Sequence, residues 1–272
     1  MPPQSALITV MVNAARKASI RLKRDYGEVD QLQVSKKGPA DFVTVADMRT
    51  EKLLREELGH ARPGFGFLME EAGEHPGKDP HRRWIIDPID GTTNFVHGIA
   101  QFAISIAAEE NGEITAGLIF EPINEELFWA EKGQGAYLND RRIRVSSRTH
   151  MAQSLFATGI PFMGRGTEAD HDNFLAEMKA VMSVSAGIRR FGSAALDLAY
   201  VAAGRFDGFW ERKLQPWDMA AGILIVREAG GLVSDLSGRD SMLDSGSIIA
   251  ANPNLQPDLR KLVTRARPWT KS

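Results

Sequence analysis

An apolar run followed at once by paired acids constrains the fold of this chain more than any other feature. Trp-Ile-Ile leads directly into Asp-Pro-Ile-Asp-Gly-Thr-Thr-Asn at positions 87–94. The proline cannot lie inside a helix, so Asp87 and Asp90 are predicted to project from a turn that follows a buried strand. Gly91 lets the backbone approach a ligand closely, and Thr92 is predicted to open a helix whose free N–H groups suit an anion. Carboxylates beside an anion site indicate metal-dependent phosphoryl transfer.

The composition is that of a globular protein with a sizeable apolar core. The chain has 272 residues, of which 43% are hydrophobic, and a net charge of −2. This charge gives no reason to expect a membrane or nucleic-acid partner, and no apolar run approaches the ~20 residues that span a bilayer. The absence of cysteine excludes disulfides, thiolate metal sites and cysteine nucleophiles. Because no signal peptide is visible at the start, we expect a cytoplasmic protein.

Hydrophobic periodicity divides the chain into a mainly antiparallel first half and a helix-rich second half. The first half is predicted to contain helices over 7–22 and 44–59, a strand over 65–69 and an antiparallel meander within 102–137. The second is predicted to contain helices over 174–182, 193–203, 218–229 and 255–265, and strands over 206–210, 232–234 and 248–250. This alternation implies a sheet covered by helices. We therefore expect one domain over 1–272, with an α+β part at 1–145, an α/β part at 146–272, and the site between them.

Four separate motifs indicate the family that the chain resembles. Besides residues 87–94, these are Trp-Asp-Met-Ala-Ala-Gly at 217–222, Asp-Phe-Val-Thr-Val-Ala-Asp at 41–47, and the pair Glu70-Glu71. In this order they resemble the inositol monophosphatase family, and the resemblance extends over residues 41–250. It implies a mixed α/β fold, the layered α/β/α/β/α sandwich of the inositol monophosphatase and fructose-1,6-bisphosphatase type. It also implies a homodimer.

The resemblance further implies a set of site residues. Metal ligands would be Glu70, Asp87, the Ile89 carbonyl, Asp90 and Asp218. Substrate contacts would be Asp90, Gly91, Thr92, Thr93, Ser193, Ala194, Glu211 and Asp218. Glu70 and Thr92 would orient the attacking water, with Asp47 acting beside Thr92. Because all the ligands are oxygens, a hard cation is favoured, and the resemblance implies two to three Mg²⁺ ions.

Several of these acids have structural interpretations that the sequence leaves open. Thr44-x-x-Asp47 has the form of a helix capping box, which would by itself account for Asp47. Asp218 stands where a helix is predicted to begin, so it could both cap that helix and bind a metal. Glu211 could be a solvated glutamate at the end of a strand, and Glu71 is expected to be structural or outer-sphere.

The reaction that this pattern indicates is hydrolysis of a phosphate monoester by metal-activated water. No Gly-x-Ser-x-Gly elbow, Walker loop or complete dinucleotide fingerprint is present, and the six histidines form no metal pair at helical or finger spacing. Thr93-Asn94-Phe95 is similar to the inositol phosphatase branch, so inositol-1-phosphate is the expected substrate. Fructose-1,6-bisphosphate, histidinol phosphate and a nucleotide bisphosphate stay open, because Arg212 and Lys213 could favour a second anionic group.

A regulatory role is an alternative from a different class. Bacterial members of the family that the chain resembles can serve as partners of the transcription machinery. The intact set of acids argues against a purely non-enzymatic role, and the mildly acidic net charge argues against direct RNA binding. A small phosphate monoester is therefore the expected partner.

Overall fold

The first half of the chain forms one large sheet. The computed structural model describes residues 4–28, 34–38, 41–161 and 166–268. Within these ranges the sheet has eight strands: β3 (Gly66–Met69), β4 (Gly73–His75), β5 (Arg82–Asp90), β6 (Ala103–Glu110), β7 (Glu113–Glu121), β8 (Glu126–Glu131), β9 (Gly135–Leu138) and β10 (Arg141–Ile143). Their order is β10-β9-β8-β7-β6-β5-β3-β4, and every neighbouring pair is antiparallel except β3 and β5. The predicted meander is confirmed by β6 to β9.

A second sheet is formed by the later part of the chain. Its five described strands are β11 (Leu155–Thr158), β12 (Gly187–Arg189), β13 (Gly208–Arg212), β14 (Leu232–Ser234) and β15 (Ser247–Ala251). In the order β12-β11-β13-β15-β14, β11 runs parallel to both of its neighbours, whereas β15 is antiparallel to both of its own. A separate antiparallel hairpin joins β1 (Val34–Gly38) to β2 (Asp41–Thr44).

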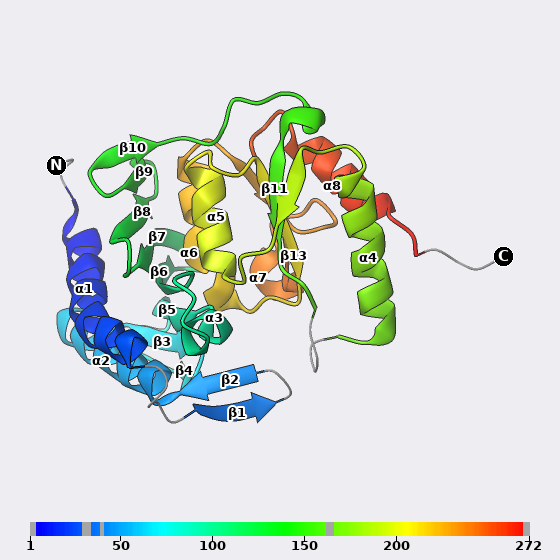
Figure 1. The fold of residues 1–272 in the computed structure, drawn as a ribbon. Coiled ribbons are helices and arrows are strands. Elements are labelled where there is room, and N and C mark those ends of the chain that lie inside the picture. The colour runs from blue at the N-terminus through cyan, green and yellow to red at the C-terminus, as the bar shows by residue number, and fades with distance from the viewer. Residues whose placement is uncertain (1–3, 29–33, 39–40, 162–165, 269–272) are drawn as a thin grey trace.

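Helices cover both sheets and also separate them. The longer ones are α1 (Ala6–Gly27), α2 (Val45–Ala61), α4 (Glu168–Met182), α5 (Ala194–Ala202), α6 (Pro216–Glu228) and α8 (Gln256–Arg265). The short ones are α3 (Thr92–Val96), α7 (Met242–Ser245) and a 3₁₀ turn at Met151–Gln153. Figure 1 shows α1 and α2 outside the large sheet, α5 and α6 between the sheets, and α4 and α8 beyond the second sheet. This arrangement confirms the predicted α/β/α/β/α sandwich. None of the helices in the described ranges is long and apolar enough to cross a membrane.

Small residues bring α6 close to the large sheet and to α5. A Cβ on Gly117 of β7 would lie 2.7 Å from the Ala221 carbonyl oxygen, and one on Gly222 would lie 2.5 Å from Leu198 Cδ1. Glycine inside a helix costs intrinsic stability, and here the close packing of two helices offsets that cost. Because Asp218 stands in the first turn of α6, this packing also fixes its carboxylate beside the large sheet.

The end of β5 differs from the sequence prediction. A turn was expected to begin at Asp87, but the strand continues to Asp90. Asp87 pairs with Ser105 and Asp90 pairs with Ala103, with an irregular register between the two pairs. Pro88 has no N–H to donate to the neighbouring strand, and a local bulge tolerates that loss without ending the strand. The two aspartates therefore project from a bulged strand end, and the prediction of a turn was wrong.

Candidate functional site

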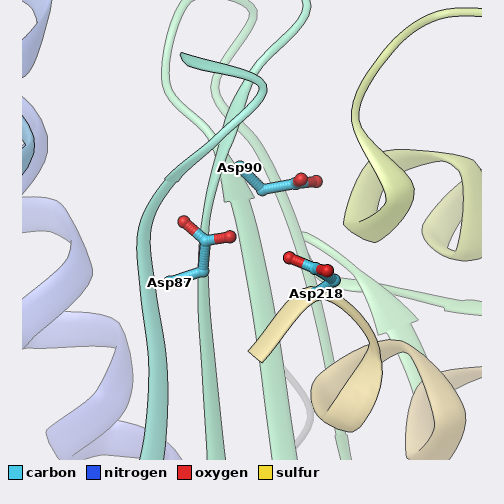
Figure 2. A group of neighbouring side chains, drawn as sticks. All are labelled: Asp87, Asp90 and Asp218. Carbon is cyan, nitrogen blue, oxygen red and sulfur yellow. The ribbon is translucent and has the colours of Figure 1, made fainter. Parts of the chain in front are cut away.

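Three aspartates gather where the end of β5 meets the start of α6. One carboxylate oxygen each from Asp87, Asp90 and Asp218 lies within 4.8 Å of the other two. Figure 2 shows the three side chains turned toward one another. Asp87 and Asp90 are buried, and Asp218 is half-buried. Carboxylates this close repel one another unless a cation or a proton lies between them. The cluster could therefore hold a metal ion.

The electrostatics of the cluster support this interpretation. Burial raises the pKa of Asp87 well above its ordinary value, and the nearby charges of Glu70, Asp90 and Asp218 raise it further. Burial also raises the pKa of Asp90 to about 6, although hydrogen bonds from Ser193 and Ala195 work in the opposite direction. A bound cation would reverse the effect of these neighbours and favour the ionised carboxylates. A donor set of oxygens alone fits a hard cation such as Mg²⁺.

Two helix ends hold the aspartates in place. Asp90 Oδ2 accepts hydrogen bonds from the Ser193 hydroxyl at 2.5 Å and from the Ala195 N–H at 2.8 Å, both at the start of α5. Asp218 Oδ2 accepts the Gln215 N–H at 2.7 Å, within a capping box that opens α6. The capping interpretation of Asp218 is therefore confirmed, and it leaves the carboxylate within the cluster. Ser193, expected to contact substrate, uses its hydroxyl to hold Asp90.

Asp47 performs a structural role and also reaches the site. Its Oδ2 accepts hydrogen bonds from the Thr44 N–H at 2.8 Å and the Thr44 hydroxyl at 2.5 Å, which completes the predicted capping box of α2. Its Oδ1 lies 3.2 Å from Thr92 Oγ1, which in turn lies 2.9 Å from the Ile89 carbonyl oxygen. Burial is the main cause that raises the pKa of Asp47 to about 6. The capping box of Asp47 is therefore confirmed, and its second oxygen contacts Thr92, whereas a catalytic role stays a prediction.

Glu70 follows β3 on a segment that another acid holds in place. Its N–H donates to the Ile86 carbonyl of β5 at 3.2 Å. Glu51 of α2 accepts the Glu71 N–H at 2.8 Å and the Ala72 N–H at 2.9 Å. Sequence reasoning missed Glu51. Glu51 stands four residues after Asp47, and this spacing could have identified it, because it puts both acids on one face of a helix.

One pocket of about 100 Å³ collects the predicted site residues. All of them except Asp47 line it, and Asp47 is connected to it through Thr92. Gly91, with φ of 97°, forms part of the wall, and a Cβ there would lie 2.9 Å from the Gln101 carbonyl oxygen. The pocket is also lined by Gly192, which precedes the predicted Ser193 and Ala194, and by residues that were not predicted from the sequence: Gly159, Ile160, Arg190, Asp197 and Leu214.

Asn94 joins the β5 motif to the segment before α5. Its side-chain nitrogen donates to the carbonyl oxygens of Gln101 and Phe191, each at 2.7 Å. The motif of the first half and the Gly192–Ala194 loop of the second are thereby tied together at the pocket.

Arg212 and Lys213 do not line this pocket. Arg212 pairs with Glu177 at 2.6 Å, and Lys213 pairs with Asp170 at 2.6 Å. Both line a neighbouring pocket instead. Their charges are paired with acids of α4. Neither side chain is therefore part of the pocket wall, whereas Arg190 is, and a preference for a second anionic group stays a prediction.

Comparison with known proteins places this site in a family. A sequence model of the inositol monophosphatase family matches residues 4–267. An inositol-1-monophosphatase from Mesorhizobium japonicum is 55% identical over 262 residues, which is 96% of this chain and 97% of the relative. A protein named Nus factor SuhB from Salmonella typhimurium is 43% identical over 249 residues, which is 92% of each.

A solved structure agrees with the fold. The extragenic suppressor protein suhB from Bartonella henselae matches with a TM-score of 0.93 at 55% identity, covering 96% of this chain and 99% of that chain. The likeness therefore extends over nearly the whole chain.

Proposed function

Because the chain belongs to the inositol monophosphatase family, we propose that it hydrolyses inositol-1-phosphate to inositol and phosphate. The family consists of metal-dependent phosphomonoesterases, and this chain is an enzyme of that class. The observation that carries the proposal is the cluster of Asp87, Asp90 and Asp218 in the wall of one pocket. The names of the relatives at 54–55% identity support inositol-1-phosphate as the substrate.

The proposed metal ligands are Glu70, Asp87, the Ile89 carbonyl, Asp90 and Asp218, holding two to three Mg²⁺ ions. When bound, Mg²⁺ supplies positive charge that polarises the phosphate and makes a nearby water more acidic. The burial of Asp87 and Asp90 supports this assignment, because buried carboxylates require a compensating charge to stay ionised. Glu70 adds a further negative charge at the same place.

Glu70 and Thr92 are the proposed positioning groups for the attacking water. The Thr92 hydroxyl directs its hydrogen to Asp47 Oδ1 or to the Ile89 carbonyl, so its oxygen can accept a hydrogen bond from water. Backbone N–H groups at Gly91, Thr92 and Thr93 are proposed to hold phosphate oxygens. The alcohol part of the substrate would then contact Asp90, Ser193, Ala194, Glu211 and Asp218.

The first test is phosphate release in Mg²⁺ from inositol-1-phosphate, fructose-1,6-bisphosphate, histidinol phosphate and 3′-phosphoadenosine-5′-phosphate. We expect a clear preference for inositol-1-phosphate, and loss of turnover in Asp87→Asn by a factor of about 10³ or more. Asp235→Asn is the matched control, because Asp235 is also buried but does not line the pocket. Wild-type rates in Asp87→Asn would exclude the metal site, and a preference for another ester would keep the site and change the substrate.

A second candidate function is a role in transcription. Relatives named Nus factor SuhB, at 42–43% identity, favour it. Binding to purified RNA polymerase by wild type and by Asp87→Asn tests this candidate. If wild type and Asp87→Asn are both retained on the polymerase, the partner role is independent of catalysis. If neither is retained, only the enzyme function remains as a candidate.

The remaining expectations belong to the same proposal. We propose one domain over residues 1–272, assembled as a homodimer in the cytoplasm, that acts on small phosphate monoesters without direct nucleic-acid contact. Sedimentation measures the mass of the assembly and so tests the homodimer. Adding RNA to the same experiment tests for nucleic-acid contact, and we expect no change in the sedimentation rate.

A further inference from the structure

Asp197 is a buried acid in the pocket that the proposed reaction does not use. It lies in α5, only 1% exposed, and it lines the same pocket as Asp90 and Glu211. Its Oδ1 has no hydrogen-bond partner among the described residues. Buried carboxyl oxygens are nearly always hydrogen-bonded, so an unsatisfied one beside a pocket needs an explanation.

The surroundings of Asp197 place it among groups that face the alcohol part of the substrate. Glu211 and Asp90 are close enough for their charges to act on it, and Arg190 acts on it in the opposite sense. Glu211 and Asp90 are two of the three acids proposed above to contact the alcohol. Ala194 stands one turn earlier on α5 and also lines the pocket, so the same side of the helix carries both residues.

No hydrogen bond among the described residues accounts for the buried Oδ1 of this side chain. Placing an unpaired carboxyl in the interior destabilises a fold, and such groups are retained mainly where function requires them. Burial, followed by the charges of Glu211 and Asp90, raises the pKa of Asp197 well above its ordinary value. Whatever its charge, a carboxyl oxygen can accept a hydrogen bond from an alcohol hydroxyl.

We propose that the Asp197 carboxyl hydrogen-bonds a ring hydroxyl of the substrate and thereby selects phosphate esters of polyols over esters of alcohols without further hydroxyls. Asp197 is then a specificity-determining residue on the alcohol side of the pocket. The inference rests on the proposed phosphatase function, and it adds the residue that recognises the alcohol.

The test compares Asp197→Leu with Asp197→Asn on two substrates, inositol-1-phosphate and phenyl phosphate. Leucine has nearly the same shape but removes the polar group, whereas asparagine keeps one donor and one acceptor. For the leucine variant we expect kcat/KM on inositol-1-phosphate to fall about tenfold or more, mainly through KM, and phenyl phosphate hydrolysis to stay within about twofold. The asparagine variant should keep most of the wild-type preference. Thermal unfolding of both variants should match or exceed that of wild type.

Three outcomes would contradict this inference, and each can be distinguished from the other two. An equal fall on both substrates, with a lower unfolding temperature, would assign Asp197 a purely structural role. An unchanged preference in the leucine variant would overturn the inference and leave the proposed function intact. Wild-type enzyme without any preference for inositol-1-phosphate would overturn the proposed substrate and this inference together. If the leucine variant does not fold, Asp197→Ala is measured against the same two substrates and the same criteria.

Discussion

At the scale of single residues, Asp47 shows how one acid can cap a helix and also contact a residue of the candidate site. One oxygen accepts from both donor groups of Thr44, and the other lies 3.2 Å from the Thr92 hydroxyl. The sequence could predict the capping box because it depends on spacing alone. It could not predict that Thr92, 45 residues later, would meet the second oxygen, because that contact depends on how α2 packs against β5.

The buried acids predict how the metal-free protein depends on pH. The pKa of Asp47 rises from 3.8 to about 6, chiefly through burial, so the folded state keeps a proton that the unfolded state has lost. Protonated Asp47 therefore makes its full contribution to the free energy of unfolding below pH 3.8, and this contribution is lost as the pH rises through about 6. The loss is on the order of 3 kcal/mol, from roughly two pKa units at about 1.4 kcal/mol each.

Denaturant unfolding in a chelator, at a series of pH values across this window, measures the effect. The free energy of unfolding should fall with rising pH in wild type and fall less steeply in Asp47→Asn. Saturating Mg²⁺ should flatten the slope, because a bound cation favours the ionised cluster. If the free energy of unfolding of wild type rose with pH instead, burial would not control the pKa of these acids.

At the scale of elements, two helices begin with the same capping box but differ in distance from the site. Thr44 and Asp47 open α2, and Thr167 and Asp170 open α4 in the same geometry. Each threonine oxygen accepts a backbone N–H of the first turn. Removing such a cap costs about 1 kcal/mol.

We therefore expect Thr44→Ala and Thr167→Ala to lower stability by similar amounts but to differ in activity. Thr44→Ala also frees the carboxylate that contacts Thr92, so its kcat should fall several-fold, while that of Thr167→Ala should stay near wild type. Thermal unfolding and phosphate release on the same samples measure both effects. Equal loss of activity in the two variants would mean that Asp47 acts on the site only through general stability.

The elements also show where sequence reasoning reaches its limit. Regular alternation was enough to predict β6 and β7, which are eight and nine residues long. The strands β11 and β12, of four and three residues, were missed, although the equally short β14 was predicted at 232–234. The start of α4 was missed although Thr167-x-x-Asp170 repeats the box recognised at Thr44. Asp197 was missed because, inside an apolar helix, its sequence neighbours do not show that it faces a pocket.

At the scale of the whole molecule, the pocket exists only where the two sheets and the helices between them meet. Asp87 comes from the large sheet, Glu211 from the second sheet, and Asp218 from α6 between them. The motifs could be recognised one by one in the sequence. The resemblance implied that they converge, but the geometry of that convergence could not be predicted, because it depends on the close packing of α6 through Gly117 and Gly222.

A site assembled in this way predicts that the two sheets unfold together and that the metal strengthens their connection. Hydrogen exchange followed by mass spectrometry measures the opening free energies of β7 in the first sheet and β13 in the second. Under conditions where exchange requires global opening, we expect equal opening free energies for the two strands. Adding Mg²⁺ should raise both free energies equally, because a ligand that binds only the folded state stabilises the whole cooperative unit. Asp218→Asn should abolish the rise in both strands while leaving the metal-free values nearly unchanged. A rise confined to β7 would instead mean that the ion is held by the β5 end alone, and unequal values without metal would mean that the halves at 1–145 and 146–272 are separate folding units.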